Sequence, residues 1–553
     1  MMKKTNKRKR SHHKSYLTRR QFIERLSAAG LTVGGGLALS GCEEIGSMIS
    51  PITVSTDTED DVPSVVIGSG FGGAVTALRL GEAGIRTMLL EQGKRWPIGH
   101  NTFSRYFPAD GRSTWLRTET VLPFGPSLPI SKHTGVLDRI DYDDIQVYRG
   151  TAVGGGSIVY GGISVQPPED LFYEVFPHGI SYQELQPYYE RVRQMLRITP
   201  VPADIEASPY FDYARVFTEH AANAGLEVES VGQATDWDII RSELAGTISP
   251  SAIIGESPYG INSGAKNSLD RNYLPMAEAT GHVSIHPLHR VTDIAQESDG
   301  RYGVTVEEID DTGRVRQTKQ LTTTYLFLAA GSVGTTELLV KAHELGNLPN
   351  LSGEIGKGWG SNGNVMFMRS VNELTGKNQG GPAIKIVIDR ENAVSPSSIE
   401  SVFFPIGQEC GCLLYLMSVL DTDRGQFSYN AIADKVELTW SLAGNDRAEG
   451  AALDFISRMN TANGGEIGSP SGVIFQLPNV MKHFTYHPLG GMVIGEACDF
   501  YGRVYGYPNM YVMDGAALPG SCATANPSLT IAALAERNIA AILREDMTSA
   551  ITG

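Results

Sequence analysis

The stretch "PSVVIGSGFGGAVTALRLGEAGIRTMLLEQG", residues 63–93, decides the fold of this chain. Short apolar runs at 65–67 and 88–90 predict two buried strands, and the apolar face of the segment between them predicts a helix. A turn of the pattern G-x-G-x-x-G joins the first strand to the helix, and Glu91 ends the second strand. This order is typical of a Rossmann-like α/β domain that binds a dinucleotide.

Each part of this pattern has a physical reason. The first glycine makes the tight turn, the second lets backbone N–H groups approach a pyrophosphate, and the third lets the helix pack closely on the strand. The helix N-terminus adds partial positive charge beneath the phosphates, and the acidic residue accepts hydrogen bonds from ribose hydroxyls. The cofactor contacts predicted in this stretch are Gly68, Gly70, Phe71, Gly72, Gly73 and Glu91.

Two distant glycine-rich stretches favour FAD over NAD. The first, "YRGTAVGGGSIVYGGIS" at 148–164, is a second glycine-dense loop for which a simple NAD domain has no use. The second, "YLFLAAGSVGTTELL" at 325–339, is another buried strand that runs into a glycine turn and a helix. Together they predict FAD bound along its length by discontinuous segments. The further contacts predicted for FAD are Gly150, Gly154, Gly155, Gly156, Ser157, Tyr160, Gly161, Ile163, Val291 and Gly331.

A histidine stands on stiff backbone near the C-terminus. In "FTYHPLGGM", residues 484–492, Pro488 biases His487 toward an extended conformation. The two glycines that follow allow a sharp turn or the close approach of another group. We therefore expect this imidazole to be held beside a place where something bulky binds.

The C-terminal segment predicts a strand at 510–513, which ends at Asp514 and Gly515, and then a long helix. Asn526 and Pro527 predict the start of this helix, with an N-cap side chain and a proline at its first position. The positive end of the helix would face the flavin and stabilise the negative charge of its reduced form. Asp514, Gly515, Asn526 and Pro527 are therefore predicted to contact the cofactor.

The combined motifs resemble those of one enzyme family. The N-terminal glycine pattern, "GTAVGGGS", "GWGSNGNV", "YHPLGG", "MDGAALPG" and "NPSLTIAALAERN" are similar to stretches of the glucose–methanol–choline (GMC) flavin oxidoreductases. Within this family they are most similar to the bacterial cholesterol oxidases that hold FAD non-covalently, over nearly all of residues 62–544. The resemblance implies oxidation of a sterol 3β-hydroxyl to the 5-ene-3-one, isomerisation to the 4-ene-3-one, and reduction of oxygen to hydrogen peroxide.

The resemblance also implies three catalytic residues. His487 and Asn526 match the pair that binds the substrate hydroxyl beside the flavin, where the histidine either takes the hydroxyl proton or donates a hydrogen bond. Glu400 matches the carboxylate that moves a proton during isomerisation when residues are counted back from "LLYL", whereas counting forward from "SSI" places Val402 there. We prefer Glu400, because more residues agree and because its apolar neighbours would bury it and raise its pKa.

Two other functions stay open at this point. One is a GMC dehydrogenase of another bulky alcohol that passes electrons to a quinone or cytochrome, and the other is a non-enzymatic surface lipoprotein that carries flavin. Tyr160 is relevant to the choice between an oxidase and a dehydrogenase, because members of this family usually have asparagine at the position of Tyr160. The tyrosine would reshape the flavin edge, its redox potential or its access to oxygen.

The composition of the chain limits the kinds of partner that the protein is expected to bind. The chain has 553 residues, 41% of them hydrophobic, and a net charge of −15, which argues against a nucleic-acid partner. No apolar run reaches the length of a membrane span, and no cysteine spacing indicates a metal site. Cys410 and Cys412 stand too close for an easy disulfide, so buried thiols are expected. We expect a monomer that contacts a lipid surface transiently to take up a sterol or another lipophilic alcohol.

The first 42 residues resemble an export signal. A basic start, the pair Arg19 and Arg20, and a mild Gly/Ala-rich segment that ends at Cys42 are typical of a twin-arginine lipoprotein signal. Cys42 would then be lipidated, and 43–61 would form a tether. The protein is expected in the cell envelope, in the periplasm or at the outer membrane, or secreted.

The globular part is predicted to form two discontinuous domains. A mostly antiparallel sheet covered by helices would build the α+β substrate domain, to which the loop 148–164 adds FAD contacts. The segment 101–135, rich in aromatic residues, proline and glycine, is either a lid or a packed surface excursion. The FAD-binding domain would comprise 62–100, 265–356 and 484–547, and the substrate domain 101–264 and 357–483.

Overall fold

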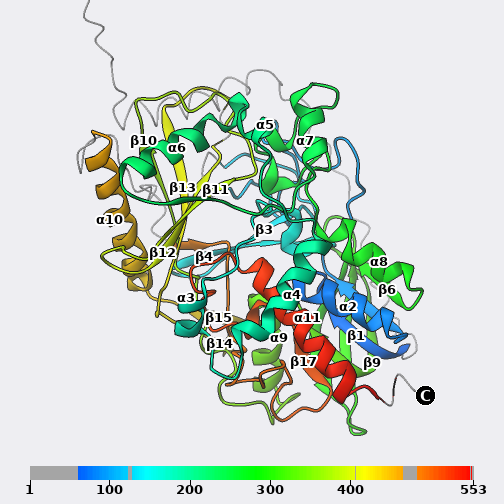
Figure 1. Cartoon of the computed structure of the whole chain (residues 1–553). Coiled ribbons are helices and arrows are strands. Elements are labelled where there is room, and N and C mark those ends of the chain that lie inside the picture. Colours follow the sequence, from blue (N-terminus) through cyan, green and yellow to red (C-terminus); the bar gives the residue numbers. More distant parts are fainter. Residues whose placement is uncertain (1–59, 123–126, 405–406, 465–482, 549, 551–553) are drawn as a thin grey trace, which may run out of the picture.

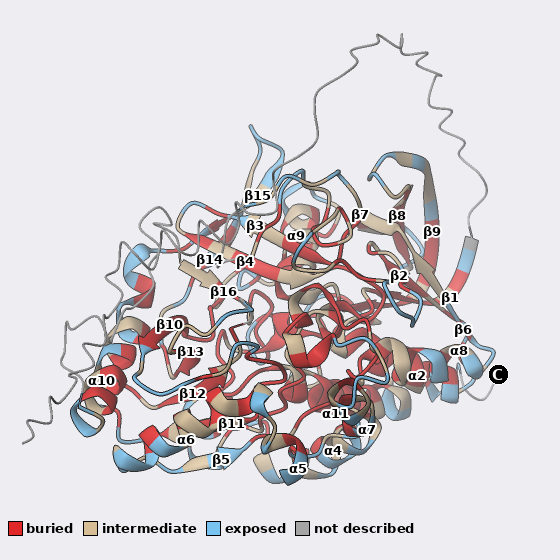
Figure 2. Ribbon diagram, turned by 90° about the horizontal axis from the view of Figure 1, so that it is seen from above, coloured by how far each residue is buried: buried red, intermediate tan, exposed pale blue. Residues whose placement is uncertain are grey.

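The computed structural model describes residues 60–122, 127–404, 407–464, 483–548 and 550. The predicted export signal, with Cys42, and most of the predicted tether lie outside this part of the chain. Two large sheets with helices on their outer faces make up the described part, and Figure 1 shows them at opposite ends of the molecule. Figure 2 shows buried residues concentrated between them and exposed residues along the outer helices. The predicted fold class is confirmed.

The first sheet contains the two strands that were predicted within residues 63–93. Its seven strands follow the order β6-β2-β1-β9-β8-β7, with β17 also paired to β9. β1, β2, β6, β9 and β17 pair in parallel, whereas β7 and β8 form an antiparallel extension next to β9. The strands are β1 (Asp60–Ile67), β2 (Thr87–Glu91), β6 (Val283–Pro287), β7 (His289–Gln296), β8 (Tyr302–Ile309), β9 (Val315–Leu328) and β17 (Met510–Val512).

Helices from distant parts of the chain accompany this sheet. α2 packs against α8 and α11, and α11 packs against α4, which comes from the range predicted for the substrate domain. None of the helices in the described ranges is long and apolar enough to cross a membrane. The helices are α2 (Phe71–Glu82), α3 (Glu169–Val175), α4 (Tyr182–Met195), α8 (Tyr273–Ala279), α9 (Gly331–Glu344) and α11 (Ser528–Glu545).

The second sheet is antiparallel, with strand order β10-β13-β12-β11-β5. All eight residues of β13 are buried, which means that both faces of this strand are covered. Leu413 and Tyr415 pack in the core with α6 and α10, whereas Leu414 and Leu416 face the opposite side. The elements are α5 (Ala203–Glu206), α6 (Asp212–Asn223), β5 (Val228–Ser230), α7 (Trp237–Leu244), β10 (Asn364–Ser370), β11 (Lys385–Asp389), β12 (Ser397–Val402), β13 (Cys412–Val419) and α10 (Asp446–Ala462).

A small sheet between the two large ones joins segments that are far apart in sequence. β16 pairs in parallel with β4, so Thr485 lies opposite Val147. This pairing places the turn that carries His487 beside the glycine-dense loop that follows β4. The strands are β3 (Leu137–Asp141), β4 (Ile145–Gly150) and β16 (His483–Thr485), and a separate hairpin consists of β14 (Gln426–Asn430) and β15 (Lys435–Thr439).

One expectation about the cysteines was wrong. Cys410 and Cys412 form a disulfide, with their Cα atoms 5.3 Å apart. Gly411 between them has a φ of +56°, a conformation that glycine adopts without penalty and that turns the chain sharply. Residue counting does not reveal this turn, which is why the spacing seemed too short. Cys498 and Cys522 are buried free thiols, as expected.

We predict that Gly72→Ala strongly destabilises the first sheet. An added Cβ at this position would lie 1.7 Å from the backbone carbonyl oxygen of Met513, and both groups belong to buried main chain that cannot move independently. The cost should exceed the ~3 kcal/mol typical of overpacking, and thermal unfolding of the purified variant measures it. Gly353→Ala is the matched control, because its Cβ would meet nothing within 4 Å. Equal stability of the two variants would contradict this packing.

Candidate active site

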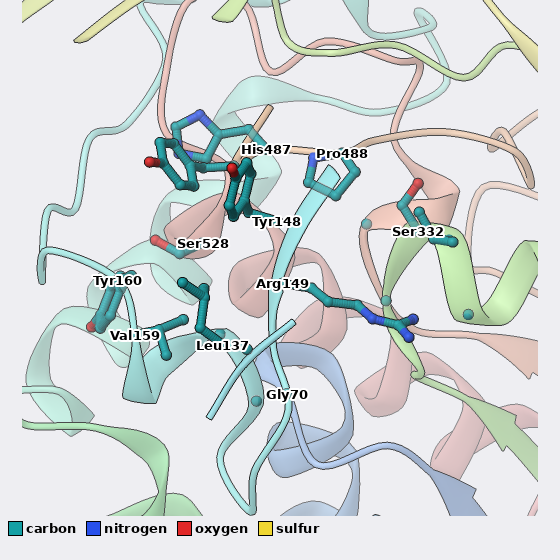
Figure 3. A pocket seen from close by; sticks show the side chains of 18 of the residues that line it. Gly70, Leu137, Tyr148, Arg149, Val159, Tyr160, Ser332, His487, Pro488 and Ser528 are labelled. Atoms are coloured by element: carbon teal, nitrogen blue, oxygen red, sulfur yellow. The ribbon is translucent and has the colours of Figure 1, made fainter. Parts of the chain in front are cut away.

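A cavity of about 1090 Å³ lies between the two sheets. Its walls come from the turn after β1, the loop after β4, the first turns of α9 and α11, the segment around His487, and strands β10, β12 and β13. In Figure 3, His487 and Tyr160 lie toward one side of this cavity, Arg149 and Ser332 toward the other, and Gly70 lies below them. The residues predicted from three distant motifs therefore share one space.

Ser69 ties the two glycine loops together. Its backbone N–H and its hydroxyl both donate to a carboxylate oxygen of Glu91, at 3.1 and 2.7 Å, and the hydroxyl accepts from the backbone N–H of Gly154 at 3.0 Å. Gly93 N–H donates to the other Glu91 oxygen at 2.7 Å. Burial raises the pKa of Glu91 against these hydrogen bonds. Glu91 lines the cavity, and its contact with a ribose stays a prediction.

One part of the cavity wall is bare backbone, which fits a dinucleotide. A Cβ added at Gly70, Gly156 or Gly331 would meet nothing within 4 Å, because these glycines border the open cavity. A Cβ on Gly155 would lie 2.7 Å from the Cα of Gly70, so the two loops touch backbone to backbone. This cradle admits close approach of phosphates to N–H groups, as FAD requires.

Most of the predicted cofactor contacts line this cavity, and three do not. Gly73 instead packs against the carbonyl of Gly68, Gly154 donates to Ser69, and the Ser157 hydroxyl bonds to Gly154 O at 2.6 Å and accepts from Leu269 N–H at 3.0 Å. These three hold the loops rather than face the cavity. The predicted contacts that line the cavity are Gly68, Gly70, Phe71, Gly72, Glu91, Gly150, Gly155, Gly156, Tyr160, Gly161, Ile163, Val291, Gly331, Asp514, Gly515, Asn526 and Pro527.

Asp514 fixes the start of α9 to the end of β17. Its carboxylate accepts from Gly331 N–H at 2.8 Å, from the Thr335 hydroxyl at 2.6 Å and from Ala516 N–H at 2.8 Å. Burial raises the pKa of Asp514 to about 6, against the effect of these three hydrogen bonds. The network keeps the backbone at Gly331 turned toward the cavity.

His487 reaches the cavity from the segment after β16. Its backbone N–H donates to the Thr485 hydroxyl at 2.8 Å, and its ring Nδ1 lies 3.1 Å from the side-chain nitrogen of Asn364. Burial lowers the pKa of His487 to about 4, so the ring is neutral at pH 7. The residue as a whole is half-buried, and it lines the cavity.

Glu400 and Asn526 meet across the two sheets. Glu400, on β12, is 2% exposed, and the Asn526 side chain lies beside its carboxylate. Burial raises the pKa of Glu400 to about 7, an effect that the polar interaction with Asn526 opposes. Glu400 Oε2 and Asn526 Oδ1 are buried without a partner among the described residues, although buried polar atoms are normally paired. These two oxygens therefore indicate a polar ligand at this point.

The structure corrects the predicted role of Asn526 as an N-cap. Helix α11 begins at Ser528, one residue later than predicted, with Pro527 at the N-cap position and no side-chain cap. The Asn526 side chain instead lines the cavity beside Glu400, and its Oδ1, the atom that would cap the helix, has no partner among the described residues. Sequence offers no sign of this orientation.

A large part of the cavity wall around Glu400 is apolar. Glu400 and Val402, the two residues between which the sequence registers differed, stand two positions apart on β12 and both line the cavity. Described residues of the segment 101–135 pack into a buried cluster with the residues after β4, and Tyr106 and Trp115 of this segment line the cavity wall. The apolar lining comprises Tyr106, Trp115, Leu122, Met366, Met368, Val402, Phe404, Leu414 and Leu416.

Sequence reasoning missed Arg149 and Asn364. Arg149 lines the cavity and is held by Asp138, which accepts from its Nε at 2.8 Å. Both residues stand inside glycine-rich motifs, Arg149 next to Gly150 and Asn364 in "GWGSNGNV". The predictions rested on the glycines of these motifs and not on their polar neighbours. A charged or amide residue inside a glycine-rich motif would have been the signal.

Comparisons with known proteins agree with this site. Family models described as GMC oxidoreductase match residues 28–358 and 461–535, and one described as GMC oxidoreductase, C-terminal, matches 362–469. A cholesterol oxidase from Mycobacterium tuberculosis is 27% identical, over 86% of this chain and 90% of that protein, and one from Acinetobacter baumannii is 26% identical, over 86% and 93%. The solved structure of a fungal aryl-alcohol oxidase shares the fold, with a TM-score of 0.61 at 13% identity, over 89% of this chain and 100% of that chain.

We predict that Gly156→Ala folds but loses flavin. The new Cβ would project into the open cradle and meet cofactor rather than protein. A steric cost of ~1–3 kcal/mol corresponds to about ten- to hundredfold weaker FAD binding. Titration of the flavin-stripped variant with FAD measures the affinity, and Gly353→Ala again serves as control. Unchanged affinity in the Gly156 variant would place the cofactor elsewhere.

Proposed function

The chain belongs to the GMC oxidoreductase family, and from this we propose that it oxidises the 3β-hydroxyl of a sterol, with FAD held non-covalently in the cavity. Members of this family are flavoproteins. The observation that carries the proposal is the pair of buried, unpartnered oxygens on Glu400 and Asn526, measured within the described part of the chain. Both residues line the cavity, as do the bare glycines and the apolar side chains.

The roles of the side chains follow from their positions. When bound, FAD supplies the acceptor for the hydride that leaves the alcohol carbon. Asn526 and His487 bind the hydroxyl and orient it, and the neutral state of His487 avoids placing an unpaired cation in an apolar space. The hydroxyl proton needs an acceptor, and the cavity offers either His487 or the Glu400 carboxylate.

The apolar lining supports a sterol rather than a small polar alcohol. Side chains from β10, β12 and β13 and from the segment 101–135 surround the space beyond Glu400. Burial of a large apolar substrate there gains about 25 cal/mol per Å² of apolar surface removed from water. The similarity to two proteins named cholesterol oxidase agrees with this substrate class.

Glu400 also supports the isomerisation step. A pKa near 7 lets a carboxylate take a proton at C4 of the 5-ene-3-one and return it at C6 at neutral pH. The apolar surroundings keep water from exchanging that proton. Oxidation and isomerisation can therefore share one residue without movement of the steroid.

Tyr160 favours a second candidate, a GMC dehydrogenase with a quinone or cytochrome as acceptor. Its ring contacts Phe71 edge to face at 5.5 Å, and Lys266 Nζ lies 5.5 Å from the ring centroid. The hydroxyl is buried with no partner in the ranges the structure describes. A bulky ring replaces the usual asparagine at the cofactor wall, which would restrict access of oxygen.

We further propose that the protein is exported by the twin-arginine pathway and anchored through Cys42. The basic start, the arginine pair and the cysteine in this order support the proposal. A lipid-anchored monomer would meet sterols in the adjoining membrane surface.

Anaerobic mixing of the purified yellow protein with sterols, long-chain alcohols and aryl alcohols tests the function. We expect a 3β-hydroxysterol to bleach the flavin fastest, and His487→Gln to lower that rate at least about 100-fold with unchanged flavin content. Peroxide formation in air, compared with dye reduction alone, identifies the acceptor. If no alcohol bleaches the flavin, the protein is a flavin carrier and not this enzyme.

Glu400→Gln should leave the 5-ene-3-one as the accumulating product, because an amide cannot carry the proton from C4 to C6. Val402→Ala is the matched control, since this residue occupies the competing register on the same face of β12. Chromatography of the steroid products separates the two enones. Normal formation of the conjugated enone by the Glu400 variant would show that the Glu400 register is wrong, whereas the Val402 variant should form the conjugated enone at the normal rate.

A further inference from the structure

The turn directly before Asn526 has a strained backbone. It runs from Cys522 to Ala525, whose N–H donates to Cys522 O at 3.0 Å. Its two central residues, Ala523 and Thr524, have φ of +51° and +69°. Positive φ at both central residues is the pattern of a type I′ turn, where glycine, asparagine or aspartate usually stands. Alanine and the β-branched threonine rarely adopt it, so the surrounding structure must hold this turn against relaxation.

The side chain of Asn362 spans the two ends of this turn. Its Oδ1 accepts from Cys522 N–H at 2.7 Å, and its Nδ2 donates to Ala525 O at 3.0 Å. A backbone N–H can only donate and a carbonyl can only accept, so these contacts fix the orientation of the amide. In an ordinary two-residue hairpin the same two backbone groups bond to each other, whereas here the carboxamide lies between them. Asn362, Cys522 and Ala525 are all fully buried, so bulk water does not reach these groups.

A second contact reaches the turn from the other sheet. The Ser398 hydroxyl donates to the backbone carbonyl of Thr524. Ser398 stands on β12 two positions before Glu400. The strand that carries Glu400 is therefore hydrogen-bonded to the turn that carries Asn526.

The segment that contains Asn362 also contacts the support of His487. The Thr485 hydroxyl lies 2.9 Å from the carbonyl oxygen of Ser361, and it accepts from the backbone N–H of His487 at 2.8 Å. Two neighbouring residues of one loop therefore contact the chain next to each of the two groups proposed to bind the alcohol.

We propose that Asn362 is a positioning residue that clamps the strained turn and so holds the Asn526 side chain in the cavity beside Glu400. The inference rests on the proposed alcohol oxidation, in which Asn526 orients the hydroxyl. The Oδ1 of Asn526 has no partner among the described residues, and helix α11 begins only at Ser528. The placement of this oxygen therefore depends on the turn before it.

Asn362→Gly tests the clamp alone, because Asn362 has a φ of +57°, which glycine adopts without penalty. The first readout needs no substrate. We would label the asparagines of the holoprotein with ¹⁵N and assign the side-chain amide of Asn526 by its loss in Asn526→Leu. We expect one sharp pair of amide signals in the wild-type protein, and shifted or broadened signals in Asn362→Gly.

Unchanged Asn526 signals in Asn362→Gly would overturn the proposal even if sterol oxidation is confirmed. Failure of every alcohol to reduce the flavin would instead remove the proposed function and leave the position of the Asn526 amide to be decided by these signals. The two failures are therefore distinguishable.

Kinetics separate positioning from a general loss of structure. We expect Asn362→Gly to lower the limiting rate of flavin reduction about 100-fold, the usual cost of a small misplacement of a reacting group. The half-saturating sterol concentration should change little. In the Asn526→Leu background the same substitution should change the rate by less than about twofold, because the side chain that it positions is absent. Equal losses in both backgrounds would refute the positioning role.

Asn392→Ala is the matched control. Asn392 is 7% exposed, and its amide also bridges backbone groups, since it accepts from Val394 N–H at 3.1 Å and donates to Ala451 O at 3.0 Å. It does not line the cavity. This variant should keep the wild-type rate and the wild-type Asn526 signals, and a loss equal to that of Asn362→Gly would refute a specific role for Asn362.

Ser398→Ala decides the matter if Asn362→Gly yields no folded flavoprotein. It removes one hydrogen bond to the same turn and leaves the clamp in place. We expect a smaller change of the Asn526 signals and of the rate, in the same direction. Wild-type signals and rate in Ser398→Ala would then overturn the proposal that this turn positions Asn526.

Discussion

The backbone contact between the two glycine loops is the constraint on which the rest of the structure depends. Gly155 lies against Gly70 so closely that no side chain fits between them, and Ser69 hydrogen-bonds both the second loop and Glu91. This contact joins the loop after β4 to the turn after β1, and β16 then pairs beside β4. The position of His487 thus depends on a contact between residues more than 300 positions earlier in the chain.

One part of the cavity wall consists of exposed glycine backbone, and another part carries polar side chains that have no partner among the described residues. An unsatisfied buried polar group costs about 1–3 kcal/mol, so folding alone would select against the oxygens that Glu400 and Asn526 leave open within the described ranges. Asn364 shows the opposite arrangement, in which every group of a buried amide is used. The contrast separates the residues that face a ligand from those that hold them in place.

Local patterns predicted the parts of this site that local backbone dictates. The strand, turn and helix around Gly70, the stiff segment at His487 and the burial of Glu400 all follow from neighbours in sequence. The Cys410–Cys412 disulfide, the uncapped start of α11 beside Asn526 and the structural use of Ser157 do not, because each depends on a positive φ or on a residue distant in sequence. Asn364 belongs to the motif "GWGSNGNV", but its hydrogen bond from the Tyr486 N–H could not be predicted from the sequence.

The division of labour between the sheets follows from strand alternation. On β13, Leu413 and Tyr415 pack beneath α6 and α10 while Leu414 and Leu416 line the cavity, and on β12 Glu400 and Val402 share the cavity face. Side chains on that face can change in size without disturbing the opposite core, since neighbours in sequence point apart. The first sheet holds the cofactor wall through backbone, which tolerates little change. Under the proposed function, substrate preference can therefore vary along the second sheet while His487 and Asn526, carried by the segments after β16 and before α11, hold the reacting hydroxyl.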